Sequence, residues 1–172
     1  MTDWNEIVTR HGQVVWSTAW RLLGNHADAS DCYRKTFLDA VRVDGRETVR
    51  DWPALFRRLA TARAMDLLRD RYRQAGRRKT LADPSSLLAC EPGPETRTEA
   101  AELAEQLRAA LAELPRRQAE AFYLVAVEGM TYREVGDRLK LDTNAVGVLL
   151  NRARKRLRRK LATVKPGSRL QD

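Results

Sequence analysis

The sequence predicts an all-α protein made of two small helical bundles joined by a flexible acidic linker, with a helix-turn-helix in the C-terminal bundle. Apolar residues recur at helical spacing nearly everywhere outside the middle of the chain, and no useful run alternates with the period of a strand. Between about residues 74 and 98 this periodicity fades, and turn-forming Pro, Gly and Ser residues gather. We therefore expect domains at residues 1–75 and 99–172, separated by a linker at 76–98.

The first bundle is expected to hold three helices. One runs from Trp4 to Leu22 and ends at Gly24, a residue that suits the left-handed position after a helix. A second is expected over residues 27–43, before Asp44-Gly45. The third begins at Trp52-Pro53, where proline fits the first turn, and ends in a basic stretch at residues 69–79.

The second bundle is expected to hold a helix at residues 99–113, a break at Leu114-Pro115, and a helix at 116–127 that ends before Gly129. Two short amphipathic helices follow, with a break of three or four residues between them. This arrangement is typical of a helix-turn-helix, whose second helix enters the DNA major groove.

Capping signals support the two short helices. Thr131 stands three residues before Glu134, the spacing of a capping box. Asp142 or Thr143 offers a side-chain oxygen to cap the second helix, and the sequence leaves both open.

The charge of the chain is positive and unevenly distributed. Residues 1–79 hold 16 basic and 10 acidic side chains. Residues 80–102 hold one basic and five acidic side chains, and residues 103–172 hold 15 basic and eight acidic ones. Seven of the ten residues from Asn151 to Lys160 are Arg or Lys, which would attract phosphate. Two nucleic-acid-binding modules are therefore expected, although the arginines of the first module would also serve solubility alone. The phosphate contacts are assigned to Arg154, Lys155 and Arg158.

The third helix presents a basic face beside an aromatic residue. Its predicted backbone-holding arginines are Arg57, Arg58, Arg63 and Arg69. Trp52 lies where a loop enters this helix, and aromatic rings beside arginines stack unpaired bases. A hydrophobic anchor for the loop is an equally good interpretation, so both roles of Trp52 stay open.

Catalytic, metal and membrane functions have little support in the sequence. There is no glycine-rich phosphate motif, and Asp28, Asp31 and Asp39 are more typical of a solvated face than of a catalytic pair. The cysteines and histidines lack ligand spacing, so no metal or cofactor is expected. Cys32 and Cys90 are expected to be free thiols. With no apolar run of about 18 residues and no secretion signal, we expect a cytoplasmic protein.

Four collinear stretches resemble the extracytoplasmic-function (ECF) sigma factors of the sigma-70 family. In the first module these are AWRLLGNHADASDCYRKTFLDAV and WPALFRRLATARAMDLLRDRYR. In the second they are LRAALAELPRRQAEAFYL, with the Leu-Pro-x-x-Gln entry at Leu114 to Gln118, and EGMTYREVGDRLKLDTNAVGVLLNRARKRLRRKL. Together they cover nearly all of residues 5–161 in the right order.

The resemblance implies a non-catalytic subunit that gives RNA polymerase promoter specificity. The first module would bind core RNA polymerase and open the minus-ten element, and the second would bind the minus-thirty-five element. Promoter DNA and core polymerase are thus the expected partners. An anti-sigma factor is a further partner that members of this family can have, and the sequence does not reveal whether one exists. The implied polymerase contacts are Asp28, Asp31, Arg34, Lys35 and Phe37. The implied base contacts are Thr143, Asn144, Asn151 and Arg152.

This chain departs from the family pattern at four places. Arg34-Lys35 replaces the usual Gln-Glu, and Ala62 replaces the polar residue, commonly Asn, that helps hold a flipped promoter base. Lys140 stands where the turn usually has Gly, and Gly147-Val148-Leu149 where many members have Lys-Ser-Arg. The Arg34-Lys35 reversal keeps a second hypothesis open, a stand-alone helix-turn-helix regulator that has lost core binding. A nucleic-acid enzyme or a protein-binding adaptor is a third.

Overall fold

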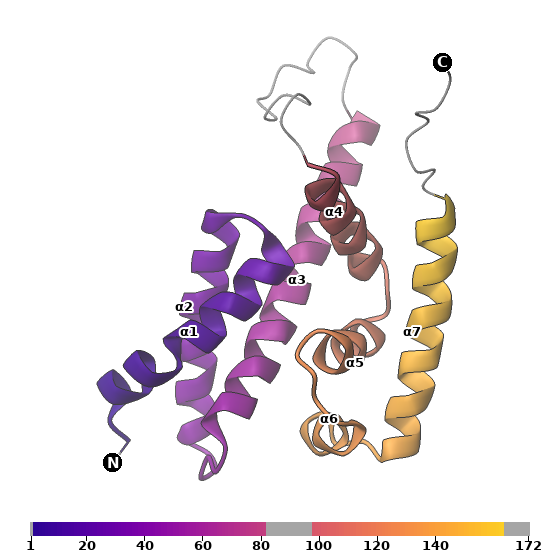
Figure 1. Cartoon of the computed structure of the whole chain (residues 1–172). Coiled ribbons are helices and arrows are strands. Elements are labelled where there is room, and N and C mark those ends of the chain that lie inside the picture. The colour runs from indigo at the N-terminus through magenta and orange to yellow at the C-terminus, as the bar shows by residue number, and fades with distance from the viewer. Residues whose placement is uncertain (1, 82–97, 164–172) are drawn as a thin grey trace, which may run out of the picture.

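The computed structural model describes residues 2–81 and 98–163, and its regular structure there consists of helices (Figure 1). The prediction of an all-α protein is confirmed. The helices are α1 (Trp4–Leu23), α2 (His26–Asp44), α3 (Trp52–Leu81), α4 (Glu99–Ala112), α5 (Arg116–Ala126), α6 (Tyr132–Leu139) and α7 (Thr143–Thr163).

Local signals explain how the first two helices begin and end. Asp3 caps α1 by accepting hydrogen bonds from the backbone N–H groups of Asn5 and Glu6. Gly24 ends α1 with a left-handed φ of 69°, as its position in the sequence predicted. Asn25 then caps α2 by accepting from the N–H of Asp28, so the residue that ends α1 and the residue that caps α2 are adjacent in the chain.

Helix α3 crosses the whole first module. It ends at Leu81, so residues 76–81 of the segment assigned to the linker are helical. Arginine, glutamine and alanine are good helix formers, and they continue α3 where apolar periodicity no longer indicates it. The remaining linker residues up to 97 lie outside the described residues, so the domain boundaries stay a prediction.

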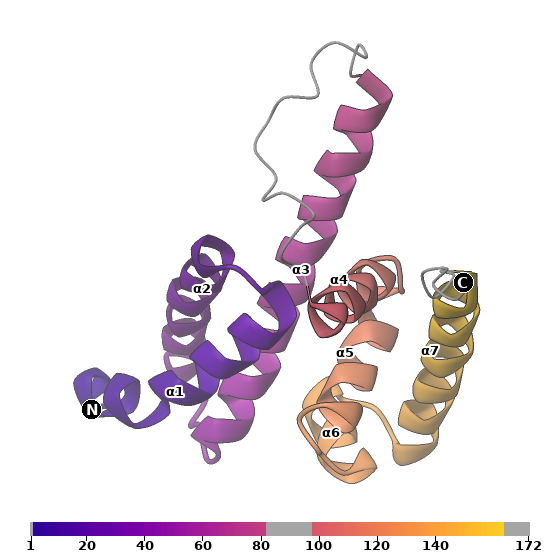
Figure 2. The same cartoon turned by 45° about the horizontal axis from the view of Figure 1, so that its top comes forward.

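The second bundle packs on the side of α3 that α1 and α2 leave free. Helices α1 and α2 cover one side of α3, and α4 and α5 cover the other (Figures 1 and 2). One continuous hydrophobic cluster includes residues from both bundles. Its buried members are Ala19, Leu22, Leu23, Ala29, Cys32, Ala64, Met65 and Leu68 from the first and Ala110, Leu111, Leu114, Ala119, Tyr123, Ala153 and Leu157 from the second. The two modules are therefore docked, with α3 between them.

The helix-turn-helix has a smaller core of its own, where α6 and α7 pack against α5. This core includes Leu124, Val135, Val146 and Leu150. The capping box is confirmed: the N–H of Glu134 donates to Thr131 Oγ1 at 3.2 Å, and the Thr131 N–H donates to the Glu134 carboxylate at 2.7 Å.

The turn between α6 and α7 is tight because Gly136 has no side chain. The N–H of Leu141 donates to the carbonyl of Gly136 at 2.8 Å, and a Cβ on Gly136 would lie 2.6 Å from the Leu141 carbonyl oxygen. Of the two candidate caps for α7, the structure uses Asp142, whose Oδ1 accepts from the N–H of Ala145 at 2.7 Å. Thr143 is the first residue of the helix instead.

Lys140 follows α6 in the left-handed region, with φ 54° and ψ 52°. A residue with a Cβ is strained there by about 1 kcal/mol, whereas glycine is not. We predict that Lys140→Gly raises the free energy of unfolding by about 1 kcal/mol, measured by urea denaturation. The matched control is Lys155→Gly, which makes the same change on the exposed face of α7. This variant should lower the free energy of unfolding by about 1 kcal/mol, because glycine disfavours a helix. If both variants change the free energy of unfolding in the same direction, the backbone conformation of Lys140 does not explain the effect.

Candidate nucleic-acid interface

Helix α7 has one buried and one exposed face. Val146, Leu150, Ala153 and Leu157 are fully or almost fully buried against the other helices. The residues with predicted DNA contacts all lie on the exposed side. These are Thr143, Asn144, Asn151, Arg152, Arg154, Lys155 and Arg158.

The exposed basic side chains of α7 lack acidic partners within residues 2–81 and 98–163. The salt bridges there include none of Arg152, Arg154, Lys155, Arg156, Arg158 and Arg159. Lys160, at the end of this run, instead forms an ion pair with Glu113. Uncompensated positive charge along one helix face repels itself and attracts a polyanion. The structure thus supports the sequence-based interpretation of this face, while its base contacts stay predictions.

Three of the four arginines predicted to hold DNA on α3 have partners inside the chain. Arg57 forms an ion pair with Glu128 at 3.6 Å, and Arg69 Nη2 donates to the carbonyl oxygen of Leu114 at 2.9 Å. Arg63 donates to Asp39, and this hydrogen bond lowers the pKa of the Asp39 carboxyl group. In this conformation the second bundle and α2 therefore use these three charges, and the predicted contacts of these arginines with DNA stay a prediction. The fourth arginine, Arg58, is half-buried.

Glu128, in the loop after α5, is the centre of a polar contact between the bundles. Its side chain is only 7% exposed. It accepts a hydrogen bond from the hydroxyl group of Thr18 at 3.0 Å and also contacts Arg21 at 3.4 Å. With Arg57, three groups of the first bundle surround this one carboxylate. Sequence periodicity gave no signal for it, since its partners lie about 70 to 110 residues away.

A second contact joins the helix-turn-helix to the loop before α3. Arg138 Nη2 donates to Asp51 Oδ2 at 2.9 Å. This loop leads to Trp52, for which stacking on an unpaired base was one of the two predicted roles. In this conformation the second bundle contacts the loop.

The structure favours the anchor role for Trp52. Its ring contacts Trp4 edge-on, with centroids 5.5 Å apart, and stacks on Phe56 at 5.7 Å. Phe56 is fully buried, so these contacts fix the loop to the core of the first bundle. A stacking role for the remaining exposed part of the ring stays a hypothesis.

The outward face of α2 combines charge with exposed apolar residues. Lys35 forms an ion pair with Asp31 at 2.8 Å, and Arg34 is exposed. Leu38 is 60% exposed and Val41 46%, although sequence analysis assigned neither to a site. The signal available was their spacing, since residues 34, 38 and 41 repeat along one helix face.

Two of the predicted polymerase contacts on α2 have other partners. Phe37 is a correction: its ring packs against Phe56 at 4.8 Å and is only 9% exposed, because it points into the core on the opposite side from Leu38. Asp28 accepts a hydrogen bond from the side chain of Asn25 and lies 3.5 Å from Arg71.

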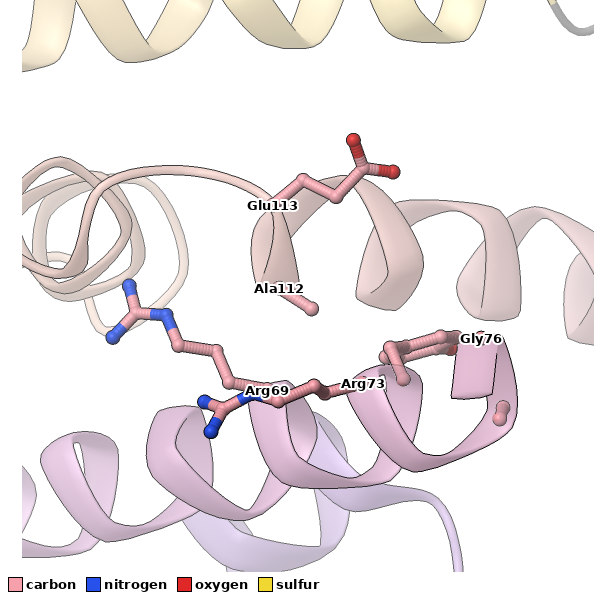
Figure 3. A pocket seen from close by; sticks show the side chains of 7 residues that line it. Arg69, Arg73, Gly76, Ala112 and Glu113 are labelled. Carbon is pink, nitrogen blue, oxygen red and sulfur yellow. The ribbon is translucent and has the colours of Figure 1, made fainter. Parts of the chain in front are cut away.

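An open cavity of about 500 Å³ lies between α3 and the end of α4. Figure 3 shows the guanidinium groups of Arg69 and Arg73 extending the same way along α3, whereas Glu113 points toward α7. Tyr72, also in its lining, donates to Glu105, and burial together with this carboxylate raises the Tyr72 pKa to about 12. The cavity is a gap in the packing between the two bundles, bordered by side chains that already hold them together.

Cys32 is a packed thiol. It is fully buried, and burial raises its pKa to about 11. Cys90 lies outside the described residues. No group of three or more His, Cys, Asp or Glu residues in the described parts could hold a metal ion. No described helix is both long and apolar enough to cross a membrane.

Comparison with known proteins gives a consistent family. A family model described as "Sigma-70, region 4" matches residues 104–157. The chain is 31% identical over 163 residues to the ECF RNA polymerase sigma factor SigE of Mycolicibacterium smegmatis, covering 94% of this chain and 63% of that protein. The chain thus spans less than two thirds of the length of this relative. Similarity to the ECF RNA polymerase sigma factor SigW of Bacillus subtilis is 25% identity, covering 91% of this chain and 87% of SigW. The chain is also 28% identical to the ferric citrate uptake sigma factor FecI of Escherichia coli, and this match covers 80% of this chain and 78% of FecI.

Two solved structures share the fold. One is the sigma factor RpoE in complex with the anti-sigma factor NepR from Bartonella quintana, with a TM-score of 0.56 and 19% identity, covering 96% of this chain and 100% of that one. The other is CnrH in complex with the cytosolic domain of CnrY, with a TM-score of 0.59 and 23% identity, covering 94% and 88%.

The exposed face of α7 generates a prediction that separates affinity from sequence preference. Replacing Arg154 and Arg158 with Ala should weaken binding to every duplex and reduce the salt dependence by about one or two units of slope, as lost phosphate contacts do. Asn144→Ala should instead relax the preference among duplexes, because Asn pairs bidentately with adenine. Both are measured by titration with labelled duplexes at several salt concentrations.

The control is Arg10→Ala, since Arg10 is exposed on α1 and pairs with Glu6. It should change neither the affinity nor the salt slope. An unchanged sequence preference in Asn144→Ala would remove Asn144 from the base-reading residues.

Proposed function

We propose that the chain is an ECF sigma factor of the sigma-70 family, the subunit that directs bacterial RNA polymerase to its promoters. The observation that supports this best is the basic face of α7, whose side chains from Arg152 to Arg159 lack acidic partners in the described residues. This face follows the capped helix α6, and most of it lies within the segment that matches sigma-70 region 4. In this proposal α7 enters the major groove of the minus-thirty-five element.

The first bundle would bind core polymerase and open the minus-ten element. The outward face of α2, with Arg34, Lys35, Leu38 and Val41, offers the mixture of exposed apolar and charged groups that protein interfaces use. Similarity to the relatives named ECF RNA polymerase sigma factors covers 94% and 91% of this chain, so it includes this bundle. The alternative of a stand-alone regulator without core binding is therefore not favoured.

The proposed function is regulatory and not catalytic, and it is exercised in the bacterial cytoplasm. Promoter opening would use binding energy alone, because unstacking a base costs a few kcal/mol that new contacts to the exposed strand offset. The partners are core polymerase and promoter DNA. An anti-sigma factor is proposed as a third partner, because the structural relative RpoE is bound to one.

The docked bundles impose an opening step on this function. Arg57 and the loop before α3 contact the second bundle through Glu128 and Arg138. They can hold promoter DNA only after these contacts are released. We infer that binding to core polymerase separates the bundles, so that each reaches its own promoter element.

The direct test of the proposed function is a pull-down with purified core RNA polymerase, followed by run-off transcription. We expect a stable complex and transcripts that depend on adding this chain. Duplex binding without any polymerase complex would favour the stand-alone regulator and contradict the proposal.

The opening step is tested by exchanging the charges of the Asp51–Arg138 ion pair. Asp51→Arg and Arg138→Asp should each increase the fraction of open molecules, by about fivefold, because loss of a partly exposed ion pair costs about 1 kcal/mol. The double variant restores opposite charges and should return the fraction to the parental value. The measurement is single-molecule energy transfer between dyes on α2 and α7.

The control is Arg10→Asp, which breaks an exposed ion pair inside α1 and should leave the open fraction unchanged. If the double variant is as open as the single variants, the ion pair does not hold the bundles together.

A further inference from the structure

One apolar side chain interrupts the polar face of α7. Val148 is 48% exposed, and it is the large hydrophobic residue left exposed on the described part of this helix. Asn144 and Arg152 lie one turn to either side of it, and both are exposed. Val148 therefore lies at the middle of the face that is proposed to meet DNA.

Neither helix formation nor packing accounts for valine at this position. A β-branched residue loses side-chain freedom in a helix, so valine favours helix formation less than leucine, lysine or arginine would at this position. The adjacent Leu149 belongs to the partly buried residues that pack on the helix-turn-helix core, and Val148 does not. Its apolar surface is free to be buried by a ligand.

The neighbouring Gly147 allows such a ligand to come close. A Cβ on Gly147 would meet only the ring of Tyr132, at 3.8 Å, which is ordinary van der Waals contact. Packing inside the protein thus does not require glycine here, although glycine weakens a helix relative to alanine. The missing side chain leaves the backbone open beside Val148, and a side chain as short as valine needs that close approach to touch a base.

The chemistry of the surroundings identifies the ligand. A protein partner with an apolar knob would have to face six basic side chains without acidic partners in the described parts of the chain, whereas a duplex compensates them with phosphates. In the major groove the apolar feature of the base edges is the C5-methyl group of thymine. Valine and a methyl group bury each other's apolar surface.

We propose that Val148 is a specificity-determining residue that recognises a thymine in the upstream promoter element through its C5-methyl group. Gly147 brings the backbone of α7 near enough for this contact. Asn144 and Arg152 lie on either side to hydrogen-bond the adjoining bases. The inference rests on the proposed function and adds to it the base that an apolar residue selects.

The test uses the full chain assembled with core RNA polymerase and a duplex library randomised at the upstream element. The library is made twice, once with thymine and once with uracil, which keeps the O4 acceptor but lacks the methyl group. We expect the parent to enrich thymine at one or two positions and to lose this preference by about fourfold in the uracil library, the effect of one buried methyl group. Val148→Ala should enrich equally from both libraries.

Two further variants separate this contact from a structural effect. Val127→Ala, a matched control at an exposed valine off α7, should behave like the parent. Gly147→Ala should raise the free energy of unfolding and yet weaken binding to duplexes generally, because it blocks the close approach.

The results distinguish failure of the inference from failure of the proposed function. Enrichment that is insensitive to the methyl group, or sensitivity that survives Val148→Ala, overturns the role of Val148 alone. Failure of the parent to assemble with polymerase or to enrich any sequence overturns the proposed function and this inference with it.

Discussion

Burial of α3 from two sides is the constraint on which the rest of the structure depends. Ala64, Met65 and Leu68 have no exposed surface, since they contribute to a single cluster with residues of both bundles. The small side chains of Ala60 and Ala64 allow neighbouring helices to pack closely on α3. A helix that is apolar on two sides has few positions left for charge, so its arginines lie at the seams between the bundles. This explains why Arg57 and Arg69 contact the second bundle.

In the proposed function, the contacts between the bundles and the promoter would compete for the same arginine side chains. Glu128 presents a carboxylate to Arg57 and Arg21 much as a phosphate of DNA would, but within a side chain that is only 7% exposed. Such partly buried pairs are screened less by salt than exposed ones. Removal of one partner also leaves the other charge buried at a cost. The docked arrangement is therefore a competitor for DNA that is covalently part of the same chain. In the proposed function, polymerase binding would supply the free energy that separates the two bundles.

The sequence predicted what is decided locally and missed what is decided between distant segments. Gly24, Thr131 and Glu134 act within their own turn, so their caps were predicted correctly. The docking of the bundles depends on Glu128 and its partners far away in the chain, and no spacing rule connects them. Phe37 was assigned to a polymerase-binding surface because the family resemblance implied it. The phase of α2 within the bundle, which decides whether residue 37 or 38 is exposed, is set by packing against Phe56.

The DNA-facing part of the second bundle also departs most from what stability alone would select. Lys140 holds a left-handed conformation, Gly147 weakens α7, Val148 exposes apolar surface, and the basic side chains that follow repel one another. Each feature raises the free energy of the isolated protein. In the proposed function, a duplex that covers the helix would bury the exposed valine and compensate the charges that lack acidic partners in the described residues. Local conflicts of this kind concentrate at functional sites because the ligand, and not the fold, satisfies them. If α7 binds promoter DNA as proposed, the stability that it lacks in the free chain contributes to affinity and sequence preference.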